Sequence, residues 1–94
     1  MPRYYFHLHN DLSTTDEEGR ELADVDAAHR AAEREAREMA AESVQNRGQL
    51  NLGHYVEVTD ERGEPVMRVR FGEAVAIMGA DRASAWANDP NADQ

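Results

Sequence analysis

Alternating polar and apolar positions open the chain and predict a β-strand over residues 3–9. Successive side chains of a strand point to opposite faces, and aromatic residues favour a pleated, half-buried surface. One face is apolar and is expected to meet a core: Tyr4, Phe6 and Leu8. The other face is expected to meet water, a partner chain or a ligand: Arg3, Tyr5, His7 and His9.

A second pattern, with the period of a helix, predicts a helix from about Val25 to Asn46 or Arg47. Asp24 is placed to cap its N-terminus, and Gly48 stands where a left-handed residue ends many helices. Small and apolar residues form an inner stripe: Val25, Ala28, Ala32, Ala36 (or Glu35), Met39 and Ser43. Because Ala buries little area, most apolar burial is expected from three residues, which are Val25, Met39 and Val44.

Alternation returns over residues 54–59 and 64–71, on either side of Asp60-Glu61-Arg62-Gly63. This pattern predicts a β-hairpin with Gly63 in the left-handed position of its loop. The inward set is His54, Val56, Val58, Met67, Val69 and Phe71. The outward set is Tyr55, Glu57, Thr59, Val66, Arg68 and Arg70. Pro65 indicates an edge strand or an unpaired position.

The remaining segments carry weaker patterns. Residues 14–16 could form a short strand, and residues 17–20 form a turn with Gly19 at positive φ. Residues 72–78 fit either a helical turn or a short strand. Residues 79–94 are acidic, with Trp86 as their one large apolar side chain, and are expected to be a disordered tail. The domain is therefore expected to span residues 1–78.

Together these elements predict an α+β fold of the order β-(β)-α-β-β. An antiparallel sheet of three or four strands is covered on one face by one long helix. The opening strand is the best candidate for a central position. Since no second helix is available, the other sheet face is expected to be open.

The composition limits the chemical activities that the chain could carry. The chain has a net charge of −9 and contains neither Cys nor Lys, which excludes disulfides, thiolate chemistry, Schiff bases and phosphate-binding loops that require Lys. Its serines lack a nucleophile elbow, so no enzyme activity and no cofactor are expected. No apolar run reaches the roughly 20 residues of a membrane helix and no signal peptide is evident. A cytoplasmic protein without membrane contact is expected.

Acidic and histidine residues suggest metal sites, which the spacing supports poorly. The acidic stretch from Asp11 to Asp24 fails the EF-hand pattern, because Asp16 and Leu22 stand where Gly and Glu are required. It is better explained as a solvated loop. A Zn or Fe(II) site is a low-probability alternative, with candidates His7, His9 and Asp11.

The open sheet face is the leading candidate for function. Its predicted members are Arg3, Tyr5, His7, His9, Tyr55, Arg68 and Arg70. Exposed patches of this kind usually mark interfaces, so the leading hypothesis is a non-enzymatic domain that binds a small protein partner or forms a homo-oligomer through this face. Weak single-stranded RNA binding on the Tyr and Arg side chains is an alternative. The overall acidity makes nucleic acid an unlikely partner.

The motifs M-P-R-Y-Y-F-H-L, D-E-E-G-R-E-L and V-E-V-T-D-E-R-G, followed by R-V-R-F and A-V-A-I, resemble a family of short bacterial proteins known as a domain of unknown function. Its members tend to open with M-P-R, two aromatics and F-H. The resemblance covers about residues 1–77 and implies no activity. It implies recurring positions, which are Arg3, Phe6, His7, Gly19, Leu22 and Gly63; His9 is not among them.

Overall fold

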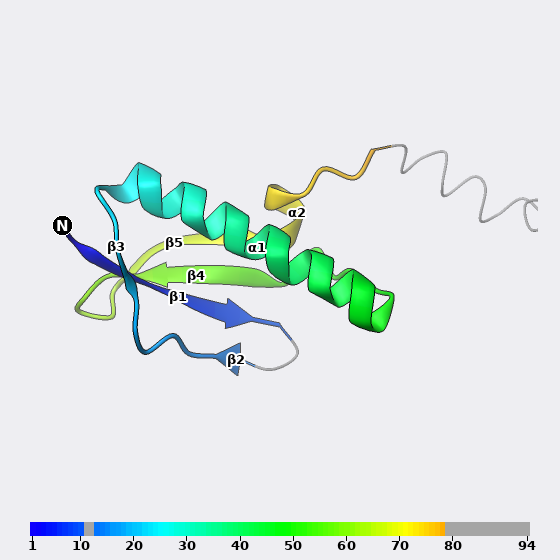
Figure 1. Ribbon diagram of the computed structural model, residues 1–94, viewed down its shortest axis with the longest axis horizontal. Coiled ribbons are helices and arrows are strands. Elements are labelled where there is room, and N and C mark those ends of the chain that lie inside the picture. Colours follow the sequence, from blue (N-terminus) through cyan, green and yellow to red (C-terminus); the bar gives the residue numbers. More distant parts are fainter. Residues whose placement is uncertain (11–12, 79–94) are drawn as a thin grey trace, which may run out of the picture.

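The computed structural model describes residues 1–10 and 13–78, which form an antiparallel sheet with one long helix across it (Figure 1). The elements are β1 (Arg3–His9), β2 (Ser13–Thr14), β3 (Arg20–Glu21), α1 (Val25–Arg47), β4 (Tyr55–Thr59), β5 (Pro65–Arg70) and α2 (Phe71–Ala74). The predicted α+β class and the single long helix are confirmed. The sheet has five strands because Arg20, expected at the end of a turn, forms β3 together with Glu21. The expected tail at residues 79–94, with Trp86, lies outside the described residues.

β1 is a central strand of the sheet, as its alternating pattern predicted. The strand order is β2-β1-β4-β5, and β3 also pairs with β1. β4 lies along one edge of β1, with Phe6 opposite Val58 and Leu8 opposite Val56. The two short strands share the other edge of β1, β2 at its end and β3 at its beginning. All pairings of β1 and β4 are antiparallel, and the apolar faces of these two strands face the helix.

The limits of α1 follow from its caps. Asp24 is extended and its Oδ1 accepts a hydrogen bond of 2.8 Å from the N–H of Ala27. Gly48 has φ of 66° and donates its N–H to the Val44 carbonyl at 2.9 Å. These contacts satisfy backbone groups that every helix end leaves without an intrahelical partner. The predicted helix span is confirmed.

The apolar burial of α1 differs from the prediction. Its buried residues are all alanine: Ala28, Ala31, Ala32, Ala36 and Ala40. Val25 and Val44 are 50% and 51% exposed, so the expectation that they supply the burial was wrong. They stand in the first and last turns, whereas Met39, in the middle of the helix, packs against the core. Small side chains let the helix lie close to the sheet, and the core volume comes from the strands.

The core also includes residues of α2. Val56, Val58 and Phe71 are the largest fully buried side chains. Phe71 was expected to end a strand, but it begins α2, so the helical turn is found over residues 72–74 and ends at Val75. The N–H groups of Phe71 and Gly72 bond to the carbonyls of His54 and Leu52. These bonds fasten α2 to the segment that precedes β4.

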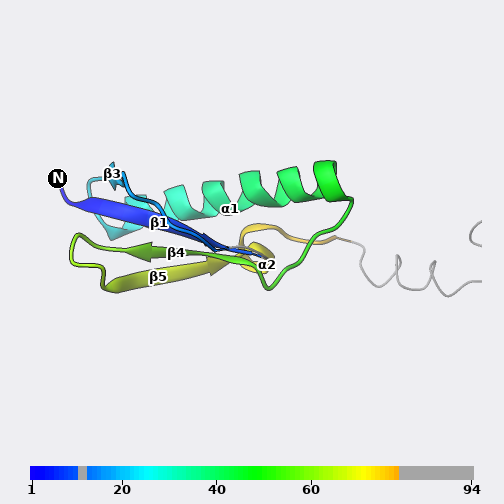
Figure 2. The ribbon, with the colours of Figure 1, turned by 90° about the horizontal axis from the view of Figure 1, so that it is seen from below.

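The molecule has two layers (Figure 2). α1 covers one face of the sheet, and none of the described helices lies on the other face, as predicted. β5 is an edge strand that begins at Pro65, in agreement with the meaning of proline in a strand. Within residues 1–10 and 13–78, no helix combines the length and the apolar character that crossing a membrane requires.

Candidate functional site

The strand register brings the predicted residues onto one surface, the open sheet face. His9 lies opposite Tyr55, and Tyr55 lies opposite Arg70. In the next row with the same orientation, His7 lies opposite Glu57, which lies opposite Arg68. Arg3 and Tyr5 continue the same side of β1 toward its start. Residues from three strands therefore share the face that the helix leaves uncovered.

A stack of three side chains forms the most ordered part of this face. The imidazole of His9 and the ring of Tyr55 lie 4.6 Å apart at 15°. The guanidinium carbon of Arg68 lies 4.2 Å from the centre of the Tyr55 ring. Since β4 lies between β1 and β5, the imidazole and the guanidinium occupy opposite faces of the phenol ring. Such cation–π and ring contacts hold the three side chains in fixed orientations.

His9 also approaches Glu57. Its Nε2 lies 3.4 Å from Glu57 Oε1, and both side chains are less than one-third exposed. The Nε2 atom is buried and makes no hydrogen bond within the described structure. The contact becomes an ion pair only when the imidazole is protonated.

His7 is engaged in the fold through both ring nitrogens. Its Nδ1 accepts a hydrogen bond of 3.1 Å from the backbone N–H of Asp16. Its Nε2 therefore carries the proton in the neutral ring, and it lies 3.0 Å from the hydroxyl oxygen of Thr59, a buried residue. His7 thus joins the segment after β2 to β4. Its nitrogens are not available to a metal in this arrangement.

Asp16 organises the segment between β2 and β3, a role that the sequence reasoning missed. Its carboxylate accepts hydrogen bonds from three backbone N–H groups, those of Phe6, Glu18 and Gly19. Burial raises the pKa of this carboxyl, but the three donors and the nearby His7 ring lower it, and the result lies below the ordinary value of 3.8. The description of this segment as a merely solvated acidic loop was wrong for Asp16. The signal was an Asp three residues before a Gly, a pattern typical of side-chain-closed turns.

The remaining predicted residues of β1 also support this segment. Arg3 donates to the Glu18 carbonyl at 2.8 Å, and its second nitrogen lies 3.8 Å from Glu21. Gly19 has φ of 71°, and a Cβ there would lie 2.9 Å from both the Tyr4 carbonyl oxygen and Tyr5 Cε2. Arg3 and Tyr5 therefore contact residues 18–21, whereas Arg68, Tyr55 and His9 form the part of the face that remains free of such a segment.

The metal alternative finds no complete ligand set in the described residues. No three His, Cys, Asp or Glu side chains among residues 1–10 and 13–78 are grouped closely enough to share an ion. Asp11, the third candidate with His7 and His9, lies outside the described residues.

The comparisons with known proteins give a family and no activity. A family model described as "Domain of unknown function (DUF6894)" matches residues 3–72. The chain belongs to this family. No curated protein and no solved structure matches the chain. The DUF6894 match runs from the first residue of β1 into α2, so it includes every strand and α1.

The positions that the resemblance marked as recurring have structural roles. Phe6 and His7 bind Asp16 through the backbone and the ring, and Arg3 binds Glu18. The Leu22 N–H donates to the Pro2 carbonyl at 3.0 Å. Two glycines take positive φ, Gly19 in the segment before β3 and Gly63 in the hairpin loop. Each position has a structural reason, and none requires catalysis.

Proposed function

We propose that this chain is a non-enzymatic interaction domain of the bacterial cytoplasm, which binds a second copy of itself through the open sheet face. The observation that carries the proposal is the ordered stack of Arg68, Tyr55 and His9 on a sheet face that no described helix covers. Tyr and Arg are enriched among the residues that dominate binding energy in interfaces. Side chains already fixed in orientation lose little entropy on binding.

A symmetric pair of such faces is complementary in charge. A two-fold contact brings the same patch of both subunits together. The patch carries cations in Arg68 and Arg70 and an anion in Glu57, whose side chain is 27% exposed. Arginine of one subunit can therefore meet Glu57 of the other, and the two sheets can pack face to face. The edge of β5 is a poorer contact surface than the open sheet face, because Pro65 and two Arg disfavour the pairing of another strand there.

The same stack disfavours RNA as the partner. A base stacks on a free aromatic face, and both faces of Tyr55 are occupied, one by His9 and the other by Arg68. Tyr5 lies against Gly19. The face therefore suits contact with protein surfaces better than stacking of bases.

Sedimentation equilibrium of the full chain, from low to several hundred micromolar, tests this proposal. We expect a dimer that Arg68→Glu weakens, since the change breaks the stack and places a second acid beside Glu57. Arg30→Glu changes the same charge on the exposed side of α1 and is the matched control. A monomer over the whole range, or equal dimerisation of the two variants, would refute the proposal.

A further inference from the structure

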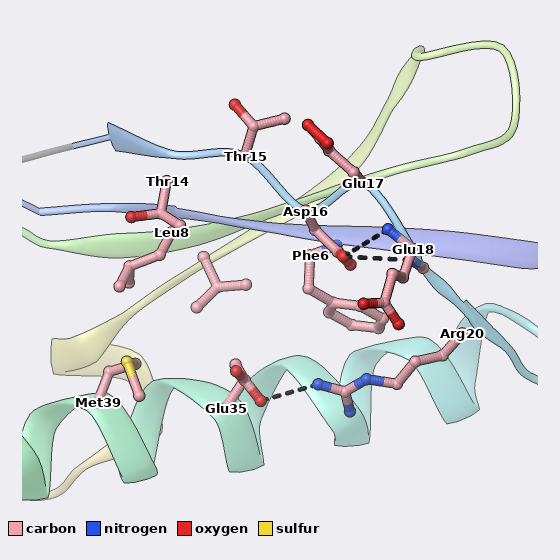
Figure 3. A pocket seen from close by; sticks show the side chains of 12 residues that line it. Phe6, Leu8, Thr14, Thr15, Asp16, Glu17, Glu18, Arg20, Glu35 and Met39 are labelled. Atoms are coloured by element: carbon pink, nitrogen blue, oxygen red, sulfur yellow. Dashed lines mark hydrogen bonds and ion pairs between the residues drawn. The ribbon is translucent and has the colours of Figure 1, made fainter.

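A groove runs along the helix side of the sheet, opposite the open sheet face. Its larger part is a cleft of about 660 Å³ between α1 and residues 14–20 (Figure 3). A second hollow of about 500 Å³ continues it toward the end of α1, and the two share Leu8, Thr14 and Met39. The groove forms because α1 packs over β4 and β5 and leaves part of β1 uncovered.

The floor of the groove is apolar and partly exposed. Leu8 of β1 lies opposite Val56 of β4, and Met39 closes the floor from α1. Leu8 and Met39 are only half-buried. Phe6 and Leu8 are alternate residues of one strand, about 6.5–7 Å apart. This is also the spacing of alternate side chains in an extended peptide, so the floor matches a segment in which every second residue is apolar.

The rim of the groove carries acids without partners. Glu17 and Glu18 are exposed, and neither carboxylate forms an ion pair with a described residue. Glu35 is held by Arg20 at 2.9 Å, and the Arg20 guanidinium also lies 4.7 Å from the centre of the Phe6 ring (Figure 3). The Arg20 guanidinium is therefore neutralised, and the carboxylates of Glu17 and Glu18 remain without an ion pair among the described residues.

We propose that this groove binds an extended segment of a partner protein in which apolar residues alternate with arginine or lysine. The apolar side chains contact Leu8 and Met39, which are half-buried, and the cations meet Glu17 and Glu18. Burial of apolar area supplies affinity, while charge complementarity selects and orients the segment. The chain's own residues 79–94 are the wrong occupant in charge, since three Asp outnumber a single Arg there.

The test uses ¹H–¹⁵N NMR titration of the full chain with a 12-residue peptide of alternating Leu and Arg. Alternating Leu and Glu, and alternating Ser and Arg, are the control peptides. We expect saturable shifts at residues 14–20 and at Glu35 and Met39 with the Leu–Arg peptide alone. Glu17→Gln with Glu18→Gln is expected to weaken binding by about three- to tenfold, as the loss of two surface ion pairs implies.

Two matched variants keep the result interpretable. Glu61→Gln with Glu64→Gln removes the same charge from the exposed hairpin loop and is expected to change the affinity less than about twofold. Arg68→Glu is expected to leave the affinity unchanged, so the groove and the open sheet face can fail separately. Absence of binding, shifts outside the groove, equal binding of the Leu–Glu peptide, or equal loss in both double variants would overturn the proposal.

Discussion

Among the described glycines, Gly19 leaves the least room for an added methyl group. Its φ of 71° is a left-handed conformation, which costs a residue with a Cβ about 1–2 kcal/mol. The Cβ would also lie 2.9 Å from the Tyr4 carbonyl oxygen, a backbone atom that cannot move without disturbing β1. Overpacking of this kind costs about 1–3 kcal/mol. Gly19→Ala is therefore expected to lower the free energy of unfolding by about 2–5 kcal/mol.

Two other glycines separate the conformational cost from the collision. Gly48 and Gly63 have φ of 66° and 79°, and a Cβ at either position would meet nothing within 4 Å. Gly48→Ala and Gly63→Ala are therefore expected to cost about 1–2 kcal/mol each, the conformational part alone. The excess cost at Gly19 measures how firmly residues 16–19 are held against β1.

Urea denaturation followed by circular dichroism measures all three variants. In thermal unfolding, at about 4–8 °C per kcal/mol for a domain of this size, Gly19→Ala is expected to lower Tm by at least about 8 °C. The slope of the unfolding free energy against urea concentration is expected to stay unchanged, since the substitution does not change the surface area that unfolding exposes. If Gly19→Ala proves no more destabilising than Gly48→Ala and Gly63→Ala, the close packing of this segment on β1 is refuted.

Two further predictions concern Asp16 and the inner stripe of α1. The pKa of Asp16 is lower in the folded state than its ordinary 3.8, so its ionised form stabilises the fold above that pH, and this contribution is lost as pH falls through the folded-state pKa. Asp16→Asn is therefore expected to destabilise the fold at pH 7, and its difference in unfolding free energy from the unsubstituted protein is expected to shrink in urea titrations toward pH 3. A difference that stays constant with pH would contradict this. Val44→Ala, at an exposed helix position, is expected to change stability by less than about 0.5 kcal/mol, whereas Ala32→Leu, at a fully buried position, is expected to cost about 1–3 kcal/mol; comparable costs in thermal unfolding would contradict the alanine stripe.

Periodicity alone predicted β1, the hairpin strands β4 and β5, the long helix and the open sheet face, because each depends on which side of an element is apolar. The caps at Asp24 and Gly48 were predictable for the same local reason. The burial of α1 was not, since the pattern shows which residues share a helix face and not where the helix crosses the sheet. Val25 shares the inner stripe but stands beyond the crossing, and is exposed.

The role of Asp16 escaped the sequence reasoning for a different physical reason. Its partners include the Phe6 N–H and the His7 ring, ten and nine residues away along the chain. No local pattern links an acid in a charged stretch to the backbone of an earlier strand. The stack of Arg68 on Tyr55 is similar, because the register makes Glu57, and not Tyr55, the direct cross-strand neighbour of Arg68.

Several β1 residues have structural roles, and this indicates where binding residues should be sought. Arg3 and His7 hold residues 16–21 through their side chains, and Phe6 does so through its backbone N–H. Substituting Arg3 or His7 would loosen this segment and report on stability whatever the domain binds. Exposed side chains are better probes, such as those of Glu17 and Glu18 on the groove rim and of Arg70 on the open sheet face. Loss of binding without loss of stability at such positions would identify the surface that the family uses.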